Sequence, residues 1–94
     1  MNDEQLKRSL QSIGKGCFIK YFQEFSNPRL SKEDMIEILM TEEGYEESGS
    51  TTRVTQSRRI INEGRADDAL KIIAGSSRLD YQIRKKAEEL RGSL

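Results

Sequence analysis

The sequence predicts an all-α protein, folded as a compact orthogonal array of about six short helices. Apolar residues recur at helical spacing along the chain, and no stretch of four or more residues alternates as a half-buried strand would. Glycines mark most of the turns between these segments. Each segment is short, which favours helices that cross one another over a long parallel bundle.

Length and charge limit what the chain can be. Its 94 residues, 34% hydrophobic and 34% charged, correspond to one domain. We divide that domain into an N-terminal helical hairpin (1–30), a helix-turn-helix-like unit (31–64) and a C-terminal helical hairpin (65–94). The net charge is zero, yet residues 1–50 hold six Lys/Arg against ten Asp/Glu, and residues 51–94 hold ten against six. This asymmetry indicates either a basic face for an anionic partner or two halves that attract each other.

The first two helices are predicted at residues 3–13 and about 17–25. Leu6, Leu10 and Ile13 share one face of the first helix, and glycines end it. The second helix ends before a proline, because the residue that precedes a proline avoids the helical region. One side of this second helix is aromatic, which indicates core packing more than an exposed groove: Phe18, Tyr21, Phe22 and Phe25.

The third helix is predicted at residues 31–43. Ser31 and Asp34 form a variant of the capping box at its start, and Gly44 is expected as a left-handed cap at its end. Three more helices follow an acidic loop. They are predicted at about 51–62 with Ser50 or Thr51 as cap, at about 66–74, and from a Ser-x-x-Asp start formed by Ser77 and Asp80 up to about residue 91.

The helix at 51–62 carries the most informative polar pattern. On a helical wheel, Val54, Ser57 and Ile61 fall inward and Ile60 lies at the margin. Its other residues are mainly arginines, amides and hydroxyls, the side chains that contact base edges and phosphates. We therefore predict a small regulator that binds double-stranded DNA through these residues and an arginine just beyond them: Arg53, Thr55, Gln56, Arg58, Arg59, Asn62 and Arg65.

With the helix before it, this helix predicts a helix-turn-helix-like pair. Two features oppose that interpretation. The connection at 44–50 is longer than the usual three or four residues, and Glu46 and Glu47 would repel phosphates close to them. The simpler alternative is a solvated polar face on a helix whose other side is core.

The alternative function is a protein-interaction module, such as an adaptor, inhibitor or accessory subunit. It would use the acidic loop around Tyr45 or the aromatic helix at 17–25. A homodimer is expected to accompany DNA binding, since dimerisation lets a short chain bury more surface.

Catalysis is not expected, because histidine is absent and no nucleophile has an evident base. No cofactor or metal is expected, since Asp67 and Asp68 lack further ligands at a defined spacing. The lone Cys17 excludes an internal disulfide and fits a buried thiol in a cytoplasmic protein. No membrane contact is expected, because no apolar run approaches the ~20 residues of a membrane helix.

Overall fold

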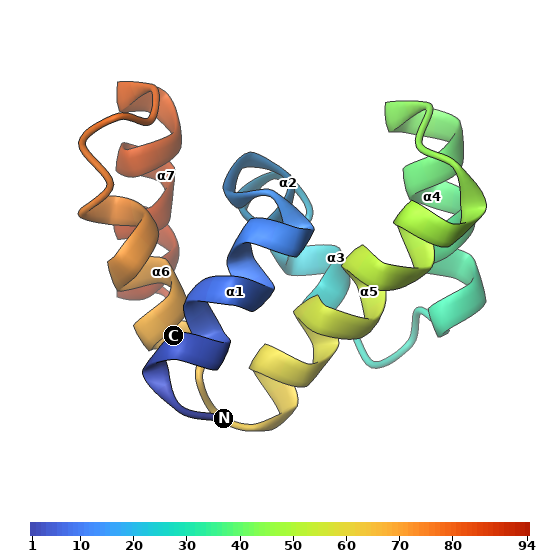
Figure 1. The fold of residues 1–94 in the computed structure, drawn as a ribbon, viewed down its shortest axis with the longest axis horizontal. Coiled ribbons are helices and arrows are strands. Elements are labelled where there is room, and N and C mark those ends of the chain that lie inside the picture. Colours follow the sequence, from blue (N-terminus) through green and yellow to red (C-terminus); the bar gives the residue numbers. More distant parts are fainter.

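The computed structural model describes all residues 1–94 and confirms the all-α fold class, with 76% of the residues helical and no strand. Figure 1 shows α5 running diagonally between α1 and α4, with α6 and α7 at the opposite end of the molecule from α4. The chain forms seven helices: α1 (Asp3–Ile13), α2 (Lys15–Lys20), α3 (Phe22–Ser26), α4 (Lys32–Glu43), α5 (Glu47–Asn62), α6 (Ala66–Ala74) and α7 (Tyr81–Gly92).

Local sequence signals set several helix ends. At the start of α1, Asn2 accepts a hydrogen bond from the backbone N–H of Gln5, whose side chain accepts one in return. The predicted box at the start of α4 is confirmed, because Ser31 and Asp34 make both reciprocal bonds. Gly44 ends α4 with φ 73°, the left-handed conformation expected of it.

The prediction of a single helix at 17–25 is wrong, because the helix is interrupted at Tyr21, which separates α2 from α3. Cys17 and Ile19 are buried together with the aromatic stripe. Residues two apart point about 200° apart on one helix, so a straight helix could not bury all of these side chains against one surface. After the break, α2 packs against α1 and α7, while α3 packs against α5. The four aromatic rings are all buried, which confirms their core role.

The predicted start of the helix at Ser50 or Thr51 is also wrong, because α5 begins at Glu47. Ser50 is fully buried, and the Thr51 hydroxyl donates to the Glu47 carbonyl oxygen at 2.8 Å, so neither residue is a cap. The Ser48-Gly49-Ser50 stretch has a composition typical of turns, yet it is helical because Ser50 is buried. The connection between α4 and α5 shrinks to residues 44–46, a length that helix-turn-helix units use.

α5 packs against α1, α3, α4 and α6. Its inward residues are buried, namely Ser50, Val54, Ser57 and Ile60. Ile60 is fully buried and Ile61 only partly, the reverse of the predicted order, because neighbours on several sides widen the buried arc of this helix. Eighteen buried apolar side chains form one cluster that extends from α1 to α7.

The C-terminal helices α6 and α7 pack against each other. The start predicted for the last helix at Ser77 is wrong. α7 begins at Tyr81 with Asp80 as its cap, since the Asp80 carboxylate accepts the backbone N–H of Gln82 at 2.7 Å. None of the seven helices combines the length and the apolar composition that crossing a bilayer requires.

Candidate nucleic-acid interface on α5

The outward side of α5 is a narrow polar arc. Beyond the first turn of α5, four exposed residues follow one another at intervals of three, four and three positions, so they form a stripe along the helix: Thr52, Thr55, Arg59 and Asn62. We call this stripe the α5 arc. A hollow lies on each side of the arc's C-terminal half.

The first hollow lies between α4 and α5 and measures about 370 Å³. One end is formed by Lys32, the first residue of α4, and the rest by the C-terminal half of α5. The lining residues are Lys32, Val54, Thr55, Arg58, Arg59 and Asn62.

The second hollow lies between α1 and α5 and measures about 210 Å³. The Ser9 hydroxyl donates to the Gln56 side-chain oxygen at 2.8 Å, which joins the two helices across its floor. The lining is polar throughout and consists of Gln5, Arg8, Ser9, Ser12, Gln56 and Arg59.

Arg59 is shared by both hollows, and neither hollow is lined by a carboxylate. Arg59 does form an ion pair with Glu63, whose carboxylate lies 2.8 Å from Arg59 Nε. Both side chains are more than a third exposed, so this ion pair contributes little stability. Arg59 can therefore exchange Glu63 for an anionic ligand at small cost.

Glu46 and Glu47, the two acids at the start of α5, lie far from the shared Arg59. Arg59 follows Glu47 by twelve residues, which is about 18 Å along a helix. That separation exceeds the Debye length of about 8 Å at physiological ionic strength. Repulsion by Glu46 and Glu47 is thus weak at Arg59. The first hollow extends to Val54, which follows Glu47 by seven residues or roughly 10.5 Å, so that end of the hollow lies closer to these acids.

Arg58 lines the first hollow but also holds the fold together. Its Nη2 donates to the carbonyl oxygen of Leu30 and, at 3.4 Å, to that of Asn27. Both acceptors belong to the loop that joins α3 to α4. Arg58 therefore fixes this loop against α5, and its guanidinium is only partly free for a ligand.

Arg53 lies outside both hollows, at the α4–α5 turn. Its guanidinium stacks over the Tyr45 ring at 3.9 Å and donates to the Gly49 carbonyl oxygen at 3.2 Å. A Cβ on Gly49 would lie 3.1 Å from the Arg53 guanidinium, so this glycine makes room for the arginine. The predicted contact residue Arg53 thus braces the turn next to Tyr45, which is itself half-buried.

Arg65 also lies apart from the α5 arc. It pairs with Asp3 at 2.6 Å and with Asp68 at 2.8 Å, and it donates to the Met1 carbonyl oxygen. These contacts raise the pKa of Arg65 and tie the start of α1 to the turn before α6. Its hollow includes both aspartates, so Arg65 is not part of an acid-free surface.

Of the seven residues predicted to bind DNA, the structure gathers five around the two hollows: Thr55, Gln56, Arg58, Arg59 and Asn62. The structure adds Arg8 and Lys32, which the sequence pattern missed. These residues come from α1 and α4, so a helical wheel of α5 could not include them. The only sequence signal was that both are basic residues in an acidic half of the chain.

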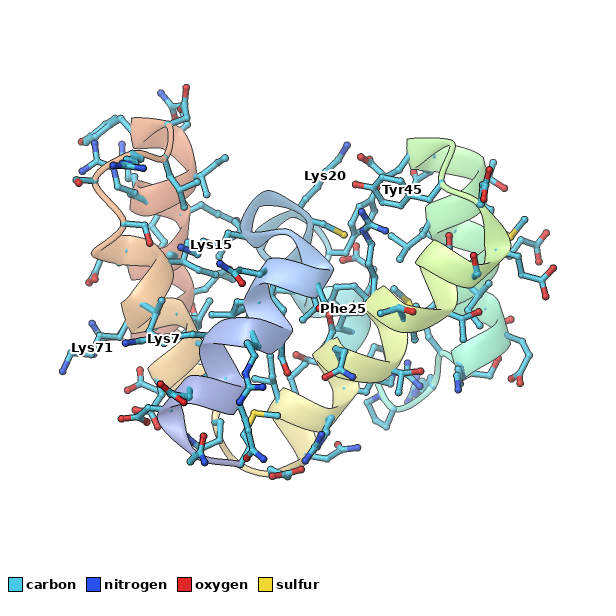
Figure 2. All side chains as sticks on the ribbon, viewed as in Figure 1. Lys7, Lys15, Lys20, Phe25, Tyr45 and Lys71 are labelled. Carbon is cyan, nitrogen blue, oxygen red and sulfur yellow. The ribbon has the colours of Figure 1, made fainter.

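A polar cluster joins α2 to the end of α4. Glu43 accepts hydrogen bonds from Lys20 Nζ at 2.7 Å and from the Tyr21 hydroxyl at 2.6 Å, and these bonds hold the pKa of Glu43 below its ordinary value. Figure 2 shows Lys20 and Tyr45 on the same, upper side of the molecule. Burial raises the pKa of the nearby Cys17 thiol, so this cysteine is held in its unreactive protonated form.

The structure contains no group of three or more His, Cys, Asp or Glu side chains arranged to hold a metal ion. In comparisons with known proteins, the chain matches no protein-family model, no curated protein and no solved structure.

Proposed function

We propose that this chain is a small non-enzymatic regulator that binds double-stranded DNA through the C-terminal half of the α5 arc. The observation that carries the proposal is the pair of hollows that share Arg59, because together they present four cationic side chains and no carboxylate. Sixteen of the 94 residues are acidic, so this surface departs from the balanced composition of the chain. Phosphates are the anions that such a surface attracts.

Arg8 and Lys32 lie on opposite sides of Arg59, one on α1 and one on α4. Phosphate contacts supply most of the affinity in DNA complexes and set the position of the protein. We assign that role to Arg8 and Lys32, which would hold phosphates on either side of α5. Arg59 between them would leave Glu63 for a phosphate or a guanine edge.

The remaining polar groups of the arc are suited to the bases. Thr55 and Asn62 are exposed, and Gln56 keeps its amide nitrogen available while its oxygen accepts from Ser9. Amides and hydroxyls of this kind contact adenine edges and thymine methyl groups. Because these side chains are few, we expect weak sequence preference and a large electrostatic share of the affinity.

The test is a titration of a fluorescently labelled duplex of random sequence across a series of salt concentrations. We expect binding at low salt. The logarithm of the association constant should then fall by roughly 0.9 per phosphate contact for each tenfold increase in salt concentration. The triple variant Arg8→Ala/Lys32→Ala/Arg59→Ala should bind more weakly and lose up to three of these contacts from the salt slope.

A matched control removes the same charge from elsewhere, as Lys7→Ala/Lys71→Ala/Lys86→Ala. All three lysines are exposed, and Lys7 and Lys71 lie on the α6 side of α1, away from α5 (Figure 2). The control should bind nearly as the unmodified protein does. Absence of binding at low salt, or equal weakening by both triple variants, would contradict the proposal. Arg58 is left unchanged because its loss would also loosen the fold.

A protein-interaction module is the second candidate. Its aromatic-helix form has little support, since Phe18, Tyr21, Phe22 and Phe25 are buried. A different place favours a contact with protein, namely a hollow on the outer side of α4 that is lined by the acids Asp34, Glu37 and Glu42.

We also infer a cytoplasmic location from the single buried thiol, which suits a reducing compartment. Fractionation of cells that express a tagged chain would test this location.

A further inference from the structure

We propose that copies of this chain associate with one another by seating Tyr81 of one copy in a hollow on the outer side of α4 of the next copy. This contact does not depend on the proposed DNA binding, because it uses neither hollow beside the α5 arc.

The receiving surface is a hollow of about 470 Å³ with an apolar floor and an acidic rim. Leu30 and Ile38 form the floor and are only partly covered by the rest of the chain. Asp34, Glu37 and Glu42 lie around them, and no cation lines the hollow; Thr41 completes the lining. The fitting ligand is therefore an apolar group surrounded by positive charge.

The chain presents such a group at the start of α7. Tyr81 is 63% exposed, one of only three large hydrophobic side chains that are exposed. The Arg84 guanidinium lies 5.9 Å from its ring centroid, and Lys85 follows one helical turn after Tyr81 on the same side. Arg78 precedes it, while the intervening Asp80 turns its carboxylate onto a backbone N–H of the first turn of α7.

The two surfaces are complementary in charge, and each has an apolar centre, which favours a second copy as the occupant. A tyrosine that fills a pocket inside a polar rim is the kind of anchor that dominates protein interfaces. The hollow is lined mainly by residues of α4, and Tyr81 is the first residue of α7; Figure 1 shows these two helices at opposite ends of the molecule. The contact is thus heterologous, and each copy can use both of its surfaces at once.

The association should be weak and sensitive to salt. One aromatic side chain in one hollow buries less than the roughly 800 Å² per partner of a stable interface. The charges around the contact are exposed, so ions screen their attraction. We expect monomers at low concentration and a rising average mass as concentration increases at low salt.

Sedimentation velocity of the full chain over a concentration series measures this mass. The variants Glu37→Lys and Lys85→Glu each place like charges across the contact and should weaken association about tenfold or more. Mixed in equal amounts, they should associate again. The new lysine of one variant then faces the new glutamate of the other, and the unmodified Glu37 and Lys85 meet at the second contact.

Two controls make the charge changes elsewhere: Glu4→Lys on α1, and Lys86→Glu on a different side of α7. Both positions are exposed and lie outside the hollow, so neither variant should alter the average mass appreciably. Circular dichroism checks that each variant remains helical. A third variant, Tyr81→Ala, lacks the side chain that fills the hollow, so it should also sediment as a monomer.

Three results would overturn the proposal. One is a chain that remains monomeric at the highest concentration and lowest salt. Another is association that Glu37→Lys and Lys85→Glu leave unchanged, which would place the contact elsewhere. The third is a mixture of the two variants that stays monomeric, which would show that these side chains do not face each other.

Discussion

The two sides of α5 use similar residue types for opposite purposes. On the inward side, Ser50 and Ser57 are fully buried, and neither hydroxyl finds a hydrogen-bond partner in the protein. On the outward side, Thr55 and Asn62 are exposed beside Arg59. The inward serines act through their small size, since small side chains let helices approach closely. The outward residues act through their polar groups.

This difference shows that a run of polar residues on a helix need not form a single solvent-exposed face. Between the two sides, Arg53 and Arg58 direct their guanidinium groups to Tyr45 and to the α3–α4 loop. Each of these arginines therefore connects α5 to neighbouring structure. Only Arg59 among the three arginines of α5 is left with no partner beyond an exposed ion pair.

The largest effect is expected from enlarging an inward residue. Ser57→Leu replaces one oxygen by three carbons at a fully buried position, a net gain of two heavy atoms. It should therefore force α5 away from its neighbours and lower the free energy of unfolding by about 1–3 kcal/mol. The matched outward change, Thr55→Leu, should leave stability within about 0.5 kcal/mol. Urea unfolding followed by circular dichroism measures both. Equal losses would show that the two sides do not differ in packing.

The adjacent arginines provide the next test. Arg58→Ala removes the donors to the Leu30 and Asn27 carbonyl oxygens and should cost about 1–2 kcal/mol of stability. Arg59→Ala removes only an exposed ion pair and should cost about 0.5 kcal/mol or less, while it weakens DNA binding. Thermal unfolding and the duplex titration, made on the same samples, separate the two roles. A stable Arg58→Ala variant would mean that its hydrogen bonds contribute nothing.

A smaller effect of opposite sign is expected at the inward hydroxyls. Ser50→Ala and Ser57→Ala remove buried hydroxyls that lack partners, and alanine is the better helix former. Each substitution should raise the free energy of unfolding by about 1 kcal/mol. Urea midpoints that fall below that of the unmodified protein would indicate that the hydroxyls are hydrogen-bonded in solution.

Much of the fold could be predicted from the sequence because its signals are local. The capping box of Ser31 and the left-handed Gly44 depend on neighbouring residues, and both were confirmed. The break at Tyr21 could not be predicted, because it depends on α2 and α3 packing against different helices. The early start of α5 was missed for a related reason: Ser-Gly-Ser has turn-like composition, and burial of Ser50 overrides it.

The candidate site was less predictable than the fold. A helical wheel correctly turned Arg59 and Asn62 outward, since the period of a helix determines direction. It could not show that Arg65 pairs with acids on other turns of the chain. Nor could it bring Arg8 to the α5 arc, because that requires the packing of α1 against α5. DNA binding itself stays a prediction.

The smallest effect is expected at Glu43, the last residue of α4, where a polar group again acts within the fold. Hydrogen bonds from Lys20 and Tyr21 lower the pKa of Glu43, so its contribution to stability is complete above the ordinary glutamate pKa of about 4.3 and is lost as the pH falls through the lower folded value. Glu43→Gln should therefore lower stability slightly at neutral pH and by less in acid. Urea unfolding at pH values from neutral to acidic measures this difference. A constant difference at every pH would mean that the two donors hold the neutral carboxyl as well as the carboxylate.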